Sequence, residues 1–120
     1  MRQQPMKKTK WSTKKPHILK PDDKRLSKYK KQLSKGGFCD SETWSLDSTI
    51  IEFTLPRLKR YHEIALQTIE DDKFINNLTK IIEAFEIVAE EEGYPDDIKQ
   101  KKVVDKGMKL FHKNFFRLWW

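Results

Sequence analysis

The chain has 120 residues, 37% of them hydrophobic and 36% charged, and a formal net charge of +7. Its single cysteine excludes an internal disulfide, and no run approaches the roughly 20 apolar residues that span a bilayer. No apolar segment follows the basic N-terminus as it would in a secretory signal, so we expect an intracellular protein without a membrane-spanning part.

The basic residues are concentrated at the start of the chain. Residues 1–35 contain 13 of the 25 Lys and Arg residues and two acids, which gives that segment a formal charge of +11. Residues 36–120 contain the other 12 basic residues and 16 acids, which gives −4. Basic segments of this kind usually bind phosphate or an acidic surface. We therefore expect a basic arm over residues 1–35 and a helical domain over residues 36–120.

The first part of this arm, residues 1–20, is expected to be disordered or extended. Its lysines repel one another, and Pro5 and Pro16 interrupt regular structure. The segment has too few apolar side chains for their burial to offset the entropy lost on ordering.

A short basic helix is expected over residues 23–34. Asp22 and Asp23 suit the positive end of a helix dipole, which marks the start. Gly36-Gly37 ends the helix, because glycine accepts the left-handed conformation at a helix C-terminus without steric cost. The apolar stripe is thin, so this helix is expected to form only when it docks on another part of the chain or on a partner.

A second helix is expected over residues 41–67, with Asp40 or Ser41 as its N-cap. Its apolar residues recur with a period of about 3.6. Pro56 lies inside this pattern, so either the helix kinks there or two helices meet near Thr54. We favour one kinked helix, because the apolar stripe keeps its phase across the proline.

Two more helices are expected over residues 72–91, with Gly93 in the left-handed position after it, and over residues 97–118. With no strand pattern of useful length, the fold class is all-α. We expect an antiparallel bundle of three main helices, to which the short basic helix is appended. The predicted core contains Trp44, Ile50, Ile51, Leu55, Leu58, Leu78, Ile81, Ile82, Phe85, Val104, Phe111, Phe115 and Trp119.

Several segments carry a recognisable pattern. Residues 37–50 read Gly-Phe-x-Asp-x-x-Thr-Trp-x-Leu-Asp-x-Thr-Ile, and residues 55–61 read Leu-Pro-Arg-Leu-Lys-Arg-Tyr. Residues 81–86 read Ile-x-x-Ala-Phe-Glu, and residues 118–120 read Leu-Trp-Trp. Together they resemble a group of small bacteriophage proteins of unassigned role. The resemblance implies a phage origin, a helical body and a place in the host cytoplasm, and it supplies no catalytic residues. It does not cover residues 1–35.

The basic arm and its helix are the predicted binding region. Cations neutralise phosphates and release counterions, and Trp11 and Tyr29 can stack on exposed bases. Because lysines greatly outnumber arginines, the expected binding has little sequence specificity. The alternatives are a solubilising tail, or an arm that folds back on acids such as Glu90, Glu91 and Glu92. The candidate residues are Lys7, Lys8, Lys10, Trp11, Lys14, Lys15, Lys24, Arg25, Lys28, Tyr29 and Lys31.

Arg57 and Arg60 are further candidates. They are three residues apart, share one helix face and can extend the basic surface. The alternative, which we favour, is that they pair with acids of the same domain such as Glu63. At the end of the chain, Trp119 is expected to close the core near Trp44, and the role of Trp120 is left open.

No catalytic or metal-binding pattern is present in the sequence. His17, His62 and His112 are scattered, and there is no glycine-rich phosphate loop, so we expect neither a metal, a cofactor nor an enzyme. The leading hypothesis is a non-enzymatic phage protein that binds nucleic acid or a nucleoprotein. One alternative is an inhibitor of a host defence or other host complex that acts by protein contact. A weaker alternative is a homo-oligomer that binds a small nucleotide.

Overall fold

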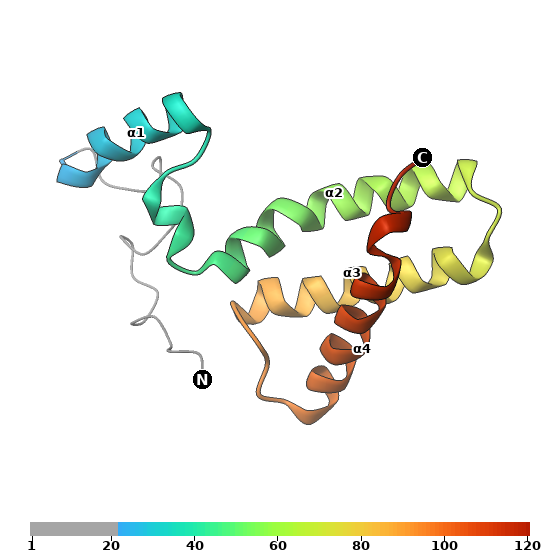
Figure 1. Cartoon of the computed structure of the whole chain (residues 1–120). Coiled ribbons are helices and arrows are strands. Elements are labelled where there is room, and N and C mark those ends of the chain that lie inside the picture. The colour runs from blue at the N-terminus through green and yellow to red at the C-terminus, as the bar shows by residue number, and fades with distance from the viewer. Residues whose placement is uncertain (1–21) are drawn as a thin grey trace. The chain divides into compact units, whose positions relative to one another are not determined.

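A computed structural model describes residues 22–120, which are helical over most of their length (Figure 1). The elements are α1 (Lys24–Gly36), the 3₁₀ turn η3 (Asp40–Thr43), α2 (Leu46–Thr68), α3 (Asp72–Glu91), α4 (Ile98–Asn114) and the 3₁₀ turn η4 (Phe115–Arg117). Residues 22–120 contain no strand. The prediction of an all-α fold is confirmed, whereas the expectation for residues 1–20 concerns a segment outside the described residues.

The described part of the chain divides into two compact units, a first unit that ends at Thr49 and a second unit over residues 50–120. This boundary lies later in the sequence than the one expected between residues 35 and 36, because the segment that follows α1 packs back onto that helix.

In the first unit, α1 is capped at both ends. The Asp23 carboxylate accepts a hydrogen bond from the backbone N–H of Arg25 at 2.9 Å. At the other end Gly37 takes a left-handed conformation, with φ 81°, and donates its N–H to the carbonyl of Leu33. Tyr29 is buried against Cys39, with Leu26 packed beside them. Tyr29 and Leu26 thus dock one side of α1 within the first unit, whereas Leu33 stays exposed.

The segment after α1 differs from the expected helix start at residue 41. Residues 40–43 form η3, and α2 begins only at Leu46. The Glu42 carboxylate accepts the backbone N–H of Cys39 at 2.7 Å, and the Cys39 sulfur lies 3.1 Å from the hydroxyl of Ser41. These local polar contacts favour a separate tight turn over the first turn of a longer helix.

Helix α2 is continuous through Pro56, so the prediction of one helix, and not two, is confirmed. Proline supplies no N–H for the regular i→i−4 hydrogen bond. Near it, the guanidinium of Arg57 donates a hydrogen bond to the carbonyl of Phe53 at 2.7 Å and lies over the Phe53 ring. The carbonyl whose regular helical donor is missing at Pro56 is that of Glu52, so the Arg57 contact is an additional bond to the neighbouring carbonyl and not a replacement.

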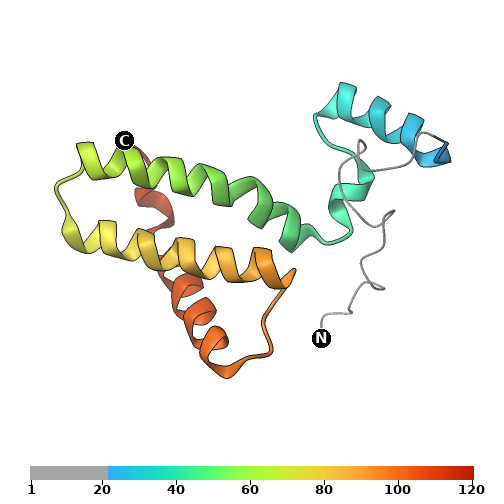
Figure 2. The same ribbon diagram turned by 180° about the vertical axis from the view of Figure 1, so that it is seen from behind.

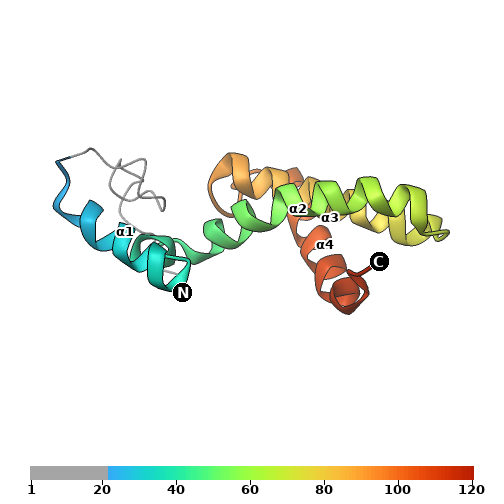
Figure 3. The same cartoon turned by 90° about the horizontal axis from the view of Figure 1, so that it is seen from above.

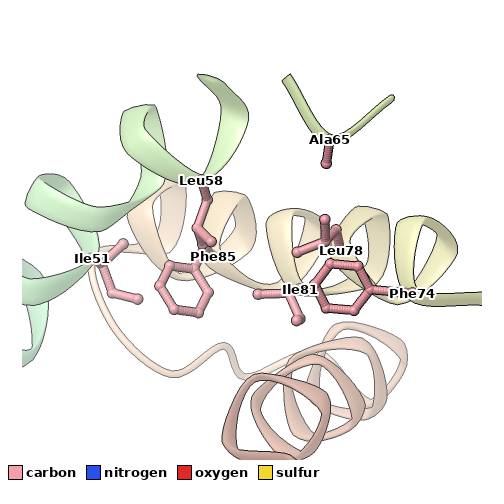
Figure 4. Packing of buried hydrophobic residues seen from close by; sticks show 7 residues of the cluster. All are labelled: Ile51, Leu58, Ala65, Phe74, Leu78, Ile81 and Phe85. Atoms are coloured by element: carbon pink, nitrogen blue, oxygen red, sulfur yellow. The ribbon is translucent and has the colours of Figure 1, made fainter. Parts of the chain in front are cut away.

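In the second unit, α2 and α3 run antiparallel, side by side (Figures 1 and 2). The buried residues with which α2 contacts α3 recur every seven residues along α2. At the start of α3, Asp71 is the N-cap and accepts the backbone N–H of Phe74 at 3.0 Å. Figure 4 shows the buried side chains of α2 and α3 gathered where these two helices and α4 meet. The buried residues of this core are Ile51, Leu58, Ala65, Phe74, Leu78, Ile81 and Phe85.

Helix α4 crosses α3 steeply and does not run alongside it as the expected bundle requires (Figures 1 and 3). The crossing is close because Gly107 of α4 lies against Ala84 of α3. A Cβ atom at Gly107 would stand 2.3 Å from the Cβ of Ala84 and 2.8 Å from the carbonyl oxygen of Lys80. Only glycine lets the two backbones approach this closely.

Four residues of the predicted core are exposed. Trp44, Ile50, Phe115 and Trp119 have between 44% and 73% of their surface accessible to solvent. For Phe115 and Trp119 the reason is the early end of α4. The Asn114 amide donates to the carbonyl of Leu110 at 2.9 Å, and the 3₁₀ turn that follows changes the phase of the pattern.

The left-handed residue after α3 is also different from the prediction. Glu92, with φ 56°, holds that position, and Gly93 follows with φ 152°. The N–H groups of both residues donate to the carbonyl of Val88, which explains why the turn comes one residue early.

Candidate nucleic-acid interface

A row of four lysines forms one face of α1, which we call the α1 lysine face. Its members are spaced i, i+4, i+7 and i+11, the spacing of one helix face, and all four are exposed. They line an open hollow together with Ser27 and Gln32. The members are Lys24, Lys28, Lys31 and Lys35.

The buried side of the same helix explains how this face is presented. Tyr29, only 5% exposed, lies on the opposite side of α1 and docks against Cys39. The lysines therefore point away from the small core of the first unit. The helix cannot turn them inward without exposing the Tyr29 ring.

Arg25 was predicted to bind a partner, but its guanidinium is engaged beside the helix start. Its Nε and Nη2 atoms donate to the Asp23 carboxylate at 3.0 and 2.7 Å. These hydrogen bonds, with the backbone N–H of Arg25, hold the pKa of Asp23 at about 2. Arg25 therefore strengthens the N-cap of α1 and leaves the lysine face as the basic surface of the helix.

The positive charge of Lys28 is partly neutralised by an acid of the first unit. Its ammonium lies 3.3 Å from the Asp40 carboxylate in an exposed ion pair. The Gln32 side chain accepts the backbone N–H of Asp40 at 2.8 Å. Hydrogen bonding to Gln32, and then to Lys28, holds the pKa of Asp40 below its usual value. Lys24, Lys31 and Lys35 make no ion pair among residues 22–120 and carry the uncompensated charge of the face.

Tyr29 has to be removed from the predicted binding set. Its ring is buried in the first unit, so it cannot stack on a base while α1 stays docked. The sequence pattern shows only that Tyr29 lies at helical spacing between Leu26 and Leu33. Lys35 is the residue to add, because it completes the four-lysine row.

Arg57 and Arg60 lie on α2. Both belong to the second unit and are engaged on their own helix. Arg57 contacts Phe53, as described above, and Arg60 pairs with Glu63 at 2.9 Å. The alternative of pairing within the domain is confirmed for Arg60.

The remaining predicted binding residues precede the part of the chain that the structure describes. They are Lys7, Lys8, Lys10, Trp11, Lys14 and Lys15. Their role as phosphate or base contacts stays a prediction.

Residues 22–120 also bear on two other kinds of site, metal centres and membrane spans. Nowhere in that range do three or more His, Cys, Asp or Glu side chains gather as the ligands of a metal ion would. No helix of the described segment is both long and apolar enough to cross a membrane.

A second hollow, of about 340 Å³, lies at the end of the chain in the second unit and is mainly apolar. Trp119 and Trp120 line it and are exposed. The Tyr61 hydroxyl donates to the carbonyls of Arg117 and Trp119 at 3.2 and 3.0 Å, which fastens this segment to α2. The hollow is also lined by Thr68, Ile69, Phe74 and Arg117.

Comparison of the chain with models of protein families, with curated proteins and with solved structures found no match. The resemblance to small bacteriophage proteins therefore stays a prediction.

Proposed function

We propose that this is a non-enzymatic bacteriophage protein that binds nucleic acid or a nucleoprotein in the host cytoplasm, with little sequence specificity. The observation that supports the proposal best is the α1 lysine face. Four exposed ammonium groups lie on one side of a capped helix, and three of them have no carboxylate partner among the described residues.

The chemistry of this face fits a phosphate backbone. Over 11 residues a helix rises about 16 Å, so the row can follow several consecutive phosphates. Lysine contributes charge without the two-pronged hydrogen bonding by which arginine reads guanine. The expected interaction is therefore electrostatic, sensitive to salt and nearly independent of sequence.

A matched pair of variants tests the proposal. The first replaces Lys24, Lys31 and Lys35 with Gln, and the second replaces Lys30, Lys73 and Lys101, which lie off the α1 lysine face. Both lower the net charge by the same amount. With a labelled DNA duplex, the first variant should reduce the slope of log K against log salt by about 2 to 3, since each lost phosphate contact removes about 0.9.

The control variant should keep a slope close to that of the unmodified protein. The proposal for this face is wrong if the two variants lose affinity equally, because net charge alone then accounts for the binding. It is also wrong if neither variant changes the slope.

A host protein is a second candidate partner, and the exposed Trp119 and Trp120 beside an apolar hollow favour it. Tryptophans are common anchors of protein interfaces. A pull-down from nuclease-treated host lysate, with the full chain and with a Trp119→Ala, Trp120→Ala variant, tests this candidate. A partner that survives nuclease and needs the tryptophans supports it, whereas loss of every partner on nuclease treatment contradicts it.

A further inference from the structure

The second unit contains its own concentration of basic residues. Residues 50–97 contain five basic residues and 12 acids, whereas residues 98–120 contain seven basic residues and one acid. The net charge of this part of the chain is therefore mildly negative only on average, because α4 and the C-terminal turn are strongly basic.

The lysines of α4 repeat the arrangement found on α1. Lys102, Lys106, Lys109 and Lys113 are again spaced i, i+4, i+7 and i+11, and all four are exposed. We call them the α4 lysine face. Val104, Gly107 and Asn114 are buried on the side that faces α3. The α4 lysine face lies on the other side of the helix. From the Cα of Lys102 to the Cα of Lys113 it extends about 16 Å.

A fifth lysine approaches this face from α3. The nearby ammonium of Lys106 lowers the pKa of Lys80, partly opposed by Glu83. The close crossing at Gly107 brings these two cations together although they repel each other. Neighbouring lysine side chains present a local positive field that attracts anions.

An exposed aromatic ring follows α4 in the 3₁₀ turn at its C-terminal end. Phe116 follows Lys113 by three residues and is 88% exposed. Its ring packs edge-on against Phe115, with centroids 5.2 Å apart, and Phe115 packs in turn against Phe111 at 5.5 Å. Phe111 contacts the buried Phe85 at 5.1 Å. This series of rings runs from the core to the surface and supports Phe116 in an exposed position.

We propose that the α4 lysine face and Phe116 form a second binding site, for single-stranded nucleic acid. The lysines neutralise consecutive phosphates, and Phe116 stacks on an unpaired base. Cations that follow the backbone beside an exposed aromatic ring are the usual features of single-strand binding sites. A duplex keeps its bases stacked inside, so it can use the lysines but not Phe116. The site lies in the second unit and does not depend on the α1 lysine face.

The charge part of the site is tested with a labelled oligothymidylate of about 20 nucleotides, long enough for known single-strand sites. The full chain carries Lys102→Gln, Lys109→Gln and Lys113→Gln, and fluorescence anisotropy measures affinity across a salt series. The slope of log K against log salt should fall by about 2, at about 0.7 for each lost contact. The Lys30, Lys73 and Lys101 variant serves again as the control of equal charge.

The stacking part is tested with Phe116→Ala. Affinity for the oligothymidylate should fall by about tenfold, as is usual when a stacking ring is removed. Affinity for a duplex of equal length should stay unchanged, and Phe116→Trp should keep single-strand binding. Since Phe116 is so exposed, the fold should be retained, and circular dichroism checks this. Phe38→Ala, at another exposed aromatic residue, is the matched control.

Several results would overturn the proposal. One is a slope of log K against log salt that stays unchanged in the variant of Lys102, Lys109 and Lys113. Another is a slope that falls by the same amount in the control variant of Lys30, Lys73 and Lys101. A third is a loss with Phe116→Ala that is the same for single strands and duplexes, or that Phe116→Trp does not restore. If only the α1 variant loses binding, the α4 site is wrong and the proposed function stands. If only the α4 variant loses binding, the α1 lysine face is wrong and this site stands.

Discussion

Gly107 shows how one residue determines the crossing of α3 and α4. In an ordinary exposed helix, Gly→Ala stabilises by about 1 kcal/mol. Here the new Cβ would overlap Ala84 and the Lys80 carbonyl, and overpacking of this kind costs about 1–3 kcal/mol or more when backbone has to move. The two backbones cannot separate without opening the core around Phe85. The steric effect should therefore outweigh the gain in helix propensity.

We predict that Gly107→Ala lowers the free energy of unfolding, by about 1–2 kcal/mol, measured by urea denaturation. Gly36→Ala is the matched control, because its new Cβ meets only the Phe38 ring at an ordinary 3.8 Å. That variant should be neutral or slightly more stable. Equal or greater stability of Gly107→Ala would show that the crossing tolerates a methyl group.

Asp71 performs two tasks at the start of α3. Its carboxylate accepts the N–H of Phe74 and pairs with Arg117 at 2.9 Å, and Arg117 also lies over the Phe74 ring. The Phe74 hydrogen bond, and then Arg117, hold the pKa of Asp71 below its usual value. A lowered folded-state pKa means that this stabilisation is present above the unfolded pKa of about 3.9 and is lost as the pH falls through the folded value.

Two substitutions at Asp71 separate its role as N-cap from its ion pair with Arg117. Asp71→Asn keeps a side-chain oxygen for the N-cap and loses the ion pair, so its melting temperature at pH 7 should fall less than that of Asp71→Ala. Both variants should show a weaker loss of stability than the unmodified protein when the pH is lowered from 5 towards 2. An acid dependence unchanged by Asp71→Asn would mean that other carboxylates dominate that range.

At the scale of elements, α1 depends on a single large buried side chain. The described core of the first unit consists of Tyr29 and Cys39 with Leu26 beside them. An isolated helix of 13 residues is marginal in water, and this one also carries a row of like charges. The caps at Asp23 and Gly37 help, but docking of Tyr29 provides the main apolar contact.

We predict that Tyr29→Ala unfolds α1, because removing a buried aromatic ring costs about 3–5 kcal/mol. The far-ultraviolet circular dichroism signal should lose the contribution of 13 residues. Tyr29→Phe keeps the ring and should retain the helix. Full helicity in Tyr29→Ala would show that the caps alone maintain α1.

At the scale of the whole molecule, the two units differ in the size of their cores. The second unit buries a continuous series of large side chains along α3, including Phe74, Leu78, Ile81 and Phe85. The first unit buries few among the described residues. Local opening is easier where fewer apolar contacts are lost.

Native-state hydrogen exchange should therefore separate the units. The amides of α3 should exchange most slowly, through global unfolding, and those of α1 much faster, through local unfolding of the first unit. At low denaturant concentrations, added denaturant should strongly increase the exchange rates of the α3 amides and only weakly increase those of the α1 amides. Equal protection of α1 and α3 would indicate a single cooperative unit.

Much of the architecture could be predicted because it depends on local patterns. The helical period of Leu78, Ile81 and Phe85 indicates α3 and its buried side directly. The stripe that keeps its phase across Pro56 likewise indicates one continuous helix. The lysine rows follow from the same period, and the α4 row was missed because its charge was averaged with the acids of the preceding helices.

The sequence by itself determined the all-α fold class, the approximate extent of the helices and the lysine spacings, since these depend on neighbours within about four residues. Only the tertiary structure decided that Tyr29 is buried, that α4 crosses α3 at Gly107, and that Trp119 stays exposed. The physical reason is that a helical period shows which residues share a face. What that face packs against depends on where distant backbones approach and where each helix ends.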